Sequence, residues 1–370
     1  MPVWVLTGLS SLGVLLSAAL PWLQFRPNRI VEGTVRYLGF QDAGWGAVVA
    51  ALWLAPLAFL LVNRKTALRA AWVVCQLVPA VLLFGAGAVA AGLVPAESFA
   101  RVSPSWGFWL SLLLAYGGSL VLAPLTGLPK GWTSAGAFLF PVVCAVGLAT
   151  GSFQGLSLLR EYAAQPDVFW ADVVTHLTLA GAAVAAGTLV GVGTGWASYR
   201  LVRFRKVAFV VLNVVQTVPS LALFGLLIVP LAALGWGGIG NTTALVALSM
   251  HAAFPIARST LTALDHLDAA VLDAGRGLGM GKAQLLARVQ IPLALPVVLE
   301  GVRTASVQAV GNTVVAALIG AGGLGSLVFI GLGQYAPDLI LLGTLPVVAL
   351  ALGLDLAWSG VLRLLPKGTR

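Results

Sequence analysis

Uninterrupted apolar runs of about 20 residues recur along this chain and restrict its fold more than any other feature. Apolar residues make up 59% of the 370 positions, and charged residues only 9%. Soluble domains carry about 25% charged residues, so this composition indicates a chain embedded in lipid. Every backbone polar group in the bilayer core must be hydrogen-bonded within the protein, which leaves helices or a closed barrel. The runs lack the alternation that is typical of barrel strands, so helices are favoured.

Ten of these runs are predicted to span the membrane, and charged or turn-rich stretches such as Asn63-Arg64-Lys65 separate them. The first 23 residues have no basic segment before their apolar run, which favours a retained first helix over a cleaved signal. We therefore predict an all-α polytopic membrane protein with about ten transmembrane helices. The predicted spans are 3–23, 45–62, 70–94, 107–124, 135–152, 174–197, 207–232, 241–258, 296–319 and 338–362.

The distribution of Lys and Arg predicts the orientation of the chain. With both termini in the cytoplasm, 15 of the 21 basic residues fall in cytoplasmic stretches and 5 fall in outer ones. This bias agrees with the positive-inside rule. The formal net charge of +9 does not indicate a nucleic-acid partner, because the basic residues are scattered at the ends of apolar runs.

The chain is predicted to divide near residue 155. Residues 1–155 form a membrane region of about five helices, whose role no motif indicates. Residues 156–370 contain five spans and most of the intramembrane polar groups. The segment 156–162, followed by Phe169-Trp170, predicts a short helix at the outer interface, where aromatic side chains favour that depth. No clear repeat relates the two halves, so an inverted-repeat transporter gains no support.

A charged, glycine-punctuated segment at 259–295 interrupts the apolar sequence of the second half. Asp268 can cap a helix that runs to about Arg276, and the glycines at 277 and 279 permit the left-handed backbone that ends it. A second helix is predicted from Lys282 to about Val289, with Leu285, Leu286 and Val289 on one side and Lys282 and Arg288 more exposed. Pro292 and Pro296 are expected to break this helix and redirect the chain. The pattern predicts a cytoplasmic hairpin that docks a soluble partner.

This hairpin resembles the EAA loop of binding-protein-dependent ABC import permeases. The family pattern is Glu-Ala-Ala, three residues, Gly, nine residues, and then Ile-x-Leu-Pro. At the same spacing this chain has Asp273-Ala274-Gly275, Gly279 and Val289-x-Ile291-Pro292. The resemblance implies that the hairpin sits in a groove of an ATPase subunit and transmits its closure to the membrane spans. The residues expected to couple the ATPase are Asp273, Ala274, Gly275, Gly279, Met280, Lys282, Val289, Ile291 and Pro292.

Three further segments within 170–362 resemble the osmoprotectant (glycine betaine, carnitine, choline) import permeases. They are His176-Leu-Thr-Leu, the run from Gln216 to Leu223, and the glycine-rich run from Ile319 to Gly325. The resemblance implies a C-terminal five-helix core of the type I ABC importer permeases. The extra N-terminal half resembles a longer branch of the same family.

The resemblance also implies partners and a location. ATP hydrolysis would belong to separate ABC ATPase subunits, which would bind ATP and Mg, so this chain needs no cofactor of its own and is not itself an enzyme. A periplasmic or lipid-anchored binding protein would capture the solute. A second permease subunit, identical or related, would complete the transporter in the lipid of the bacterial cytoplasmic (inner) membrane. Quaternary amines are usually held in aromatic cages, and the cage would lie in the binding protein.

Two sets of polar residues in predicted spans are candidates for a translocation path. Asn213, Gln216, Thr217 and Ser220 have the spacing i, i+3, i+4, i+7, which places them on one helical face of the seventh span, and Pro219 is expected to kink that helix. A weaker set in the ninth span is Gln308, Asn312 and Thr313. Both sets can alternatively serve as interhelical hydrogen bonds.

The remaining polar residues in spans have mostly structural interpretations. Glu300 and Arg303 predict an ion pair within one helix, with a gate as the alternative. Asp355 is expected to find a neighbouring Ser or backbone group, with proton coupling as the alternative. His251 is expected to be a core histidine, with a ligand role as the alternative. For the run Gly322-Gly323-Leu324-Gly325, the family resemblance implies a structured segment near the dock of the binding protein, with a plain loop as the alternative.

Other classes of function lack their sequence signatures. Cys75 and Cys144 lie in predicted spans and are expected to be packing residues, and we predict no metal site. The sequence contains no nucleotide-binding lysine loop and no metalloprotease motif. An ion- or proton-coupled carrier would need ionisable residues at mid-membrane, and it would leave the hairpin unexplained. An intramembrane enzyme would need a nucleophile with a base, or clustered metal ligands.

Overall fold

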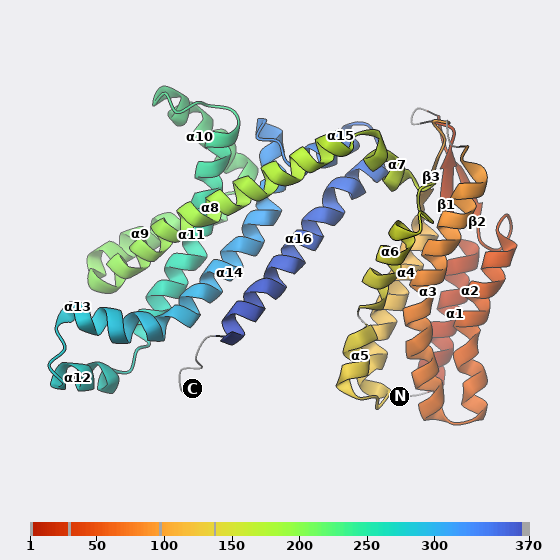
Figure 1. Cartoon of the computed structure of the whole chain (residues 1–370), viewed down its shortest axis with the longest axis horizontal. Helices are drawn as coiled ribbons and strands as arrows, with labels where there is room; N and C mark the ends of the chain where they lie inside the picture. Colours follow the sequence, from red (N-terminus) through yellow and green to blue (C-terminus); the bar gives the residue numbers. More distant parts are fainter. Residues whose placement is uncertain (1–2, 29–30, 96–97, 137, 365–370) are drawn as a thin grey trace. The chain divides into compact units, whose positions relative to one another are not determined.

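A computed structural model describes residues 3–28, 31–95, 98–136 and 138–364 of the chain. The chain forms two compact units, Met1–Ala164 (unit 1) and Gln165–Arg370 (unit 2). Both consist mainly of long helices (Figure 1). Of the basic residues that predicted the orientation, Arg29, Lys367 and Arg370 lie outside the described residues.

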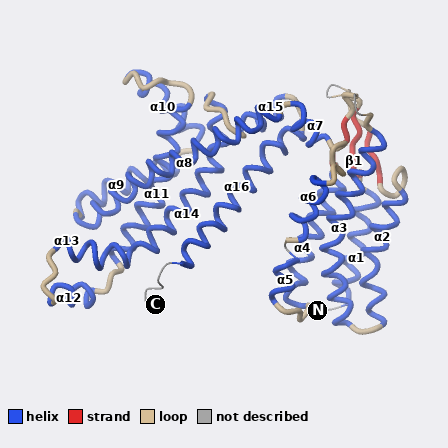
Figure 2. Tube along the Cα trace, viewed as in Figure 1, coloured by secondary structure: helices blue, strands red, loops and turns tan. Residues whose placement is uncertain are grey.

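Unit 1 is a bundle of helices with a small sheet at one end (Figure 2). Its helices are α1 (Val3–Ala19), α2 (Ala43–Ala58), η1 (Phe59–Leu61), α3 (Arg64–Leu93), α4 (Trp106–Leu122), η2 (Ala123–Leu125), α5 (Lys130–Gly136), α6 (Leu139–Ala149) and α7 (Ser157–Ala164). The segment predicted as a short interfacial helix forms α7 and is part of unit 1.

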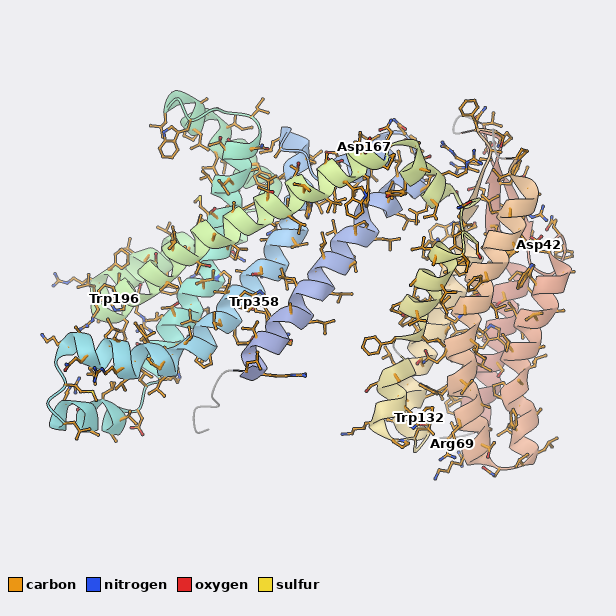
Figure 3. All side chains as sticks on the ribbon, viewed as in Figure 1. Asp42, Arg69, Trp132, Asp167, Trp196 and Trp358 are labelled. Carbon is orange, nitrogen blue, oxygen red and sulfur yellow. The ribbon has the colours of Figure 1, made fainter. Side chains whose placement is uncertain are left out.

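The sheet of unit 1 was not anticipated from the sequence. Strand β1 (Pro21–Arg26) pairs antiparallel with both β2 (Thr34–Tyr37) and β3 (Arg101–Pro104), in the order β2-β1-β3. Asp42 joins the sheet to the start of α2, because its carboxylate accepts from Trp22 Nε1 at 3.0 Å and from Arg36 at 2.7 Å. The hydrogen bond to Asp42 raises the pKa of the Arg36 guanidinium above its ordinary value. Asp42 and Arg69 lie at opposite ends of unit 1 (Figure 3).

Large side chains fill the interior of unit 1. Trp22 and Trp53 are at most 1% exposed, and Leu82 is fully buried. Trp53 lies flat against Gly13 of α1, where an added Cβ would come within 2.2 Å of the indole ring. In lipid, close contact between such large side chains holds helices together through van der Waals packing. In unit 1 the helices are therefore held by interlocking bulky residues.

The described part of unit 2 is built from helices alone. They are α8 (Pro166–Arg200), α9 (Val202–Thr217), α10 (Ser220–Ala233), α11 (Asn241–Asp265), α12 (Ala269–Gly277), α13 (Lys282–Leu285), η3 (Leu286–Gln290), α14 (Ile291–Ala316), η4 (Ala317–Ile319), α15 (Gly325–Gly333) and α16 (Pro337–Leu364). Asp167 and Trp196 mark the two ends of α8, which runs the length of the unit (Figure 3).

Glycines at a spacing of four residues let α8 approach α11 closely. Gly187, Gly191 and Gly195 are buried, and a Cβ added to each would come within 2.6–2.7 Å of atoms on α11. Small residues at this spacing are typical of helix interfaces in membranes, where close backbone approach maximises van der Waals contact. A similar contact places Gly301 of α14 against Ser259 of α11. The core of unit 2 therefore depends on small residues.

The prediction of a polytopic helical membrane protein is confirmed. In the described part of the chain, eight helices are long and apolar enough to cross a membrane, and a ninth span is possible if the bent pair α9–α10 counts as one. The first predicted span corresponds to α1, an apolar helix of 17 residues that is shorter than the other candidates. Each of the ten predicted runs overlaps a helix or a helix pair, although the end of the first run, Pro21–Leu23, lies in strand β1.

The seventh predicted span is not one helix, which corrects the prediction of a single polar face. Helix α9 ends at Thr217 and α10 starts at Ser220, and the two are bent by 113°. Val218 and Pro219 both have extended backbone, with ψ of 126° and 137°. Proline disfavours the helical conformation of the residue before it and has no N–H to continue the ladder. Asn213 and Ser220 therefore lie on different helices.

The expectation that Pro292 and Pro296 break the helix was wrong. The chain is helical from Lys282 to Ile319, over 38 residues. Residues Leu286–Gln290 form a π-helical turn directly before Pro292, which stands in the first turn of α14. The wider turn changes the hydrogen-bond register before Pro292. No N–H is then needed at the proline, and its ring does not clash with the carbonyl of the preceding turn. The second hairpin helix is therefore the direct extension of α14.

Candidate functional site

The hairpin between α11 and α14 is built from local signals. Asp268 caps α12, because its carboxylate accepts from the backbone N–H of Ala270 at 2.8 Å. Helix α12 ends in a Schellman turn with Gly279 in the left-handed region at φ 78° and with Met280 N–H donating to the carbonyl of Gly275 at 3.2 Å. Gly277 stays helical, so only one of the two glycines supplies the left-handed residue.

Gly275 allows α12 to lie close to the following helix. An added Cβ at this position would come within 2.6 Å of Leu285 Cδ1 and within 3.6 Å of Met280 Sδ. Leu272 and Leu285 are buried in the same contact. The family pattern has Ala at the position of Gly275, and the close approach of Leu285 explains why this chain has the smaller residue. The hairpin is therefore a packed unit.

The outer face of the hairpin is polar with one apolar tip. Asp273 and Arg276 form an ion pair of 2.6 Å, with side chains 68% and 62% exposed. Leu278, at the end of α12, is 78% exposed. Ala274, Gly279 and Lys282 are exposed as well, as are Ile291 and Pro292, whereas Met280 and Val289 are half-buried. This face offers charges of both signs around an apolar residue, which suits a partner's groove.

The hairpin is fixed to the rest of unit 2 at its base. Asp265, the last residue of α11, forms an ion pair of 2.9 Å with Arg205 near the start of α9. Figure 1 shows α12, α13 and the start of α9 at the same end of the unit. The predicted coupling residues therefore lie together at one end.

The polar residues of α9 have different environments. Asn213 donates to the carbonyl of Phe209 at 2.6 Å, and Thr217 donates to the carbonyl of Val214 at 2.9 Å, so both pair with their own helix. Gln216 differs, because its Oε1 atom is buried and has no hydrogen-bond partner in the described chain. An unpaired buried amide oxygen costs about 1–3 kcal/mol. Among these three residues of α9, Gln216 is therefore the one whose amide oxygen is not explained by a hydrogen bond within the described chain.

The second predicted set lies on α14 and faces two ways. Thr313 is fully buried, and its hydroxyl donates to the carbonyl of Ala309 at 2.7 Å, which is a packing environment. Gln308 is exposed and Asn312 is half-buried. The structure thus separates Thr313 from the other two residues.

Unit 2 has two buried histidines, of which His176 links two helices and His251 pairs with its own helix. His176 of α8 is fully buried, and its Nε2 lies 2.9 Å from the carbonyl oxygen of Val310 on α14. The backbone and Cβ of His176 lie beside Gly323, whose φ of +81° favours glycine. His251 is 8% exposed, and its Nδ1 lies 3.2 Å from the carbonyl oxygen of Ala247, as expected of a core histidine.

Arg303 has a partner that the sequence did not predict. Its guanidinium donates to both carboxylate oxygens of Asp355 on α16, at 2.7 and 3.0 Å, and lies 3.4 Å from Glu300 on its own helix. The expectation of a Ser or backbone partner for the Asp355 carboxylate is corrected, because a charged partner satisfies it better in a low-dielectric environment. The sequence signal that could have predicted a charged partner is the single carboxylate of Asp355 within an apolar span.

Cysteines and metal ligands contribute no site within the described residues. Cys75 and Cys144 are free, and no group of three or more His, Cys, Asp or Glu side chains could hold a metal ion.

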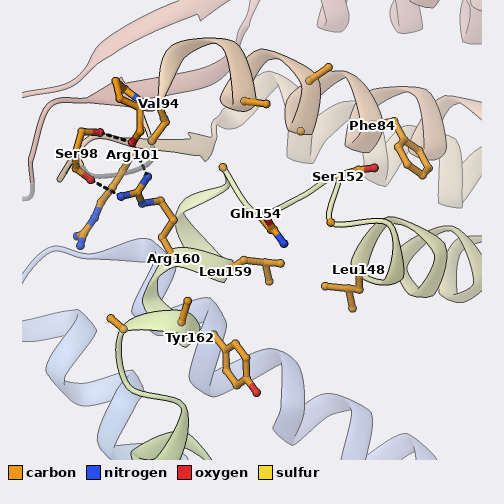
Figure 4. A pocket seen from close by; sticks show the side chains of 18 of the residues that line it. Phe84, Val94, Ser98, Arg101, Leu148, Ser152, Gln154, Leu159, Arg160 and Tyr162 are labelled. Carbon is orange, nitrogen blue, oxygen red and sulfur yellow. Dashed lines mark hydrogen bonds between the residues drawn. The ribbon is translucent and has the colours of Figure 1, made fainter.

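Unit 1 contains a pocket of its own, of about 1500 Å³ (Figure 4). Phe84 of α3, Leu148 of α6 and the loop around Ser152 form one wall. At the other end the guanidinium of Arg160 donates to the backbone carbonyls of Pro95 and Ser98. None of the residues that line it belongs to the predicted hairpin or path.

Family models match both halves of the chain. Residues 187–370 match the model described as "Binding-protein-dependent transport system inner membrane component". Residues 2–159 match the "ABC transporter permease YehY, N-terminal domain". The first match contains the whole hairpin and the second covers nearly all of unit 1.

Curated relatives decide the family. The osmoprotectant import permease protein OsmW of Salmonella typhimurium is 42% identical over 199 residues, which are 53% of this chain and 91% of the relative. The choline transport system permease protein OpuBB of Bacillus subtilis is 37% identical over 180 residues, 49% of this chain and 80% of the relative. The chain belongs to the osmoprotectant ABC import permeases. The carnitine transport permease protein OpuCB of Listeria monocytogenes is 38% identical over 196 residues, 53% of this permease and 87% of the relative.

Solved structures give weaker likenesses to this osmoprotectant permease. A chain of the MetNI methionine ABC transporter in inward-facing conformations has a TM-score of 0.49 and 22% identity, covering 54% of the permease and 97% of that chain. A chain of an amino acid ABC transporter with histidines has a TM-score of 0.46 and 21% identity, covering 56% of the permease and 97% of that chain.

Proposed function

We propose that this permease carries a small compatible solute into the cell, driven by ATP hydrolysis on separate subunits. The observation that carries the proposal is the hairpin. It is a packed element with an exposed polar face, and its second helix continues into α14. Movement of a partner bound to α12 would reach the spans along this one helix.

The proposed mechanism is alternating access. Two ATPase subunits bind ATP and Mg, close on each other and carry the hairpins of two permease subunits together. The spans then open toward the outside and accept solute from a binding protein, and they switch back after hydrolysis. The second permease is a copy of this chain or a related one, and both termini lie in the cytoplasm. Asp273, Gly279 and Lys282 are the proposed contacts because they lie on the exposed face.

The proposed substrate is a quaternary amine such as glycine betaine, choline or carnitine. Relatives with these compounds in their names support this class, and Gln216 together with Gln308 and Asn312 are the proposed polar groups along the path. An ion- or proton-coupled carrier is the alternative. It gains little from the described ionisable residues, because Arg303 already pairs with Asp355 and Glu300.

The first experiment is a pull-down of the tagged permease in mild detergent, with co-purifying chains identified by mass spectrometry. We expect an ABC ATPase and a solute-binding protein. Uptake of labelled glycine betaine and choline into proteoliposomes containing the complex then tests the substrate. Recovery of the permease alone, together with uptake that needs no ATP but follows a proton gradient, would favour the carrier.

A charge reversal tests the docking face. Asp273→Lys should leave the permease folded, because the Asp273–Arg276 pair is exposed and such pairs contribute at most about 1 kcal/mol. It should weaken binding of the ATPase and lower ATP-driven uptake. Glu32→Lys, the same charge change at an exposed position of unit 1, is the matched control. Equal uptake in both variants would remove Asp273 from the contact.

A further inference from the structure

The ion pair between α14 and α16 joins two parts of unit 2 that differ in their connection to the hairpin. Helix α14 belongs to the continuous helical segment Lys282–Ile319, whereas α16 follows it in the chain only after α15. Arg303 lies about 30 Å along this segment from Lys282, at a rise of about 1.5 Å per residue. Displacement of the hairpin therefore reaches Arg303 through one helix, whereas it reaches α16 through contacts between α14 and α16 or by the longer route through α15.

Those contacts are specific. Arg303 presents the fork of its guanidinium to both oxygens of Asp355, an arrangement that fixes direction as well as distance. Trp358, labelled in Figure 3, lies one turn further along α16 and packs against the cluster that contains Val302 and Ala305 of α14. An apolar contact alone would allow the two helices to slide, whereas the bidentate pair sets their register.

Stability does not explain the pair. Replacing a buried ion pair with apolar residues of similar size is often neutral or stabilising, and ionised groups within spans are costly. The side chains of Arg303 and Asp355 are 28% and 40% exposed, so the pair is not sealed in the core. Glu300 stands beside Arg303 at 3.4 Å with a side chain 53% exposed. The guanidinium thus has a second acid on its own helix.

We propose that Arg303 is a positioning residue whose ion pair with Asp355, here called the tie, holds α14 to α16 during transport. Glu300 is the second partner, which keeps the guanidinium of Arg303 paired when the tie opens. This inference rests on the proposed function. While the Asp355 contact is closed, α16 follows the hairpin. When α14 and α16 separate, Glu300 keeps the guanidinium paired and lowers the cost of the step. The tie therefore links ATP hydrolysis to movement of the last span.

The test uses the complete transporter in proteoliposomes, with ATP hydrolysis and glycine betaine uptake measured together. Arg303→Ala and Asp355→Ala should each lower uptake per ATP by about tenfold while hydrolysis continues. The exchange variant with Arg303→Asp and Asp355→Arg should recover most of this loss, and Arg303→Lys should be intermediate because it lacks the fork. Glu300→Gln should slow uptake and hydrolysis together and leave their ratio unchanged. Arg258→Ala, at an exposed arginine of α11, is the matched control.

Two results would overturn the tie. One is uptake per ATP at the wild-type value in both alanine variants, and the other is an exchange variant no better than the single ones. A second measurement needs no substrate: thermal unfolding of the purified permease for both alanine variants and their double. Strictly additive changes would mean that the two side chains do not interact. If the wild-type complex imports none of the tested amines, the substrate class fails, while this cycle and the ATPase rates still decide the tie.

Discussion

The helices inside unit 1 and the helices inside unit 2 are packed in different ways. The buried apolar residues described in unit 1 form one cluster with three tryptophans, whereas those described in unit 2 fall into four smaller clusters. Bulky residues interlock and resist sliding, since protein cores are close-packed. Glycine interfaces present smooth surfaces that helices can cross at close range. We therefore predict that unit 2 rearranges more readily than unit 1.

The largest expected effect is in unit 1. Trp53→Ala should lower the free energy of unfolding by about 3–5 kcal/mol, because it empties a buried site against Gly13. Equilibrium unfolding followed by circular dichroism in detergent micelles measures it. Trp132→Ala, at a tryptophan that is 70% exposed, should have little effect. If protein that survives Trp53→Ala in the membrane transports normally, unit 1 acts as a support. Lost uptake at an unchanged protein level would give it a part in transport.

Unit 2 should be sensitive to added volume. Gly191→Leu places a side chain where a Cβ already lies 2.7 Å from the carbonyl oxygen of Ala253, and overpacking of this kind costs about 1–3 kcal/mol. The control is Gly193→Leu on the same helix, because nothing in the described chain lies within 4 Å of a Cβ there. Thermal unfolding midpoints compare the two. Equal midpoints would mean that the α8–α11 interface is not tight.

The hairpin allows a smaller and more local change. Asp268→Ala removes the cap of α12 and should cost about 1 kcal/mol, whereas Asp268→Asn keeps an oxygen acceptor and should cost little. Hydrogen exchange of the backbone amides of α12 measures the local stability. Faster exchange in the alanine variant alone supports the cap. The same rate in both variants would show that packing through Gly275 and Leu285 holds the helix.

The smallest expected effect on stability is at Gln216. Gln216→Leu removes a buried oxygen that has no partner, so the free energy of unfolding should stay the same or rise slightly. Uptake of glycine betaine should nevertheless fall if the side chain contacts solute. Unfolding and uptake measured on one preparation separate the two properties. Unchanged uptake would return Gln216 to a packing role.

Local signals explain how much of the fold could be predicted. The spans follow from apolar runs, and α12 follows from Asp268 and Gly279, because caps and left-handed turns depend on a few neighbouring residues. The break at Pro219 and the helix through Pro292 show the limit of the same reasoning. One proline follows extended backbone and the other follows a π-turn, and only the surrounding structure decides between them.

Contacts between distant segments could not be predicted. The partner of Asp355 lies 52 residues away on α14, and the spacing of four between Gly187, Gly191 and Gly195 gains meaning only when α11 lies against it. In the sheet of unit 1, β3 follows β1 and β2 in the chain only after α2, η1 and α3. The strands are also too short to carry a long periodic pattern. The candidate site was therefore predicted best where it is exposed and local, at the hairpin.

The continuous helix from Lys282 to Ile319 gives this permease leverage. Its 38 residues measure about 57 Å along the axis, and the hydrocarbon of a bilayer takes up about 30 Å of that length. Roughly 25 Å then extends beyond the hydrocarbon as an arm that ends at the hairpin. A tilt of about 10° within the membrane would swing the end of such an arm by about 4 Å. A small tilt of this helix, which leaves the glycine interfaces intact, would thus displace the hairpin by about the width of a side chain.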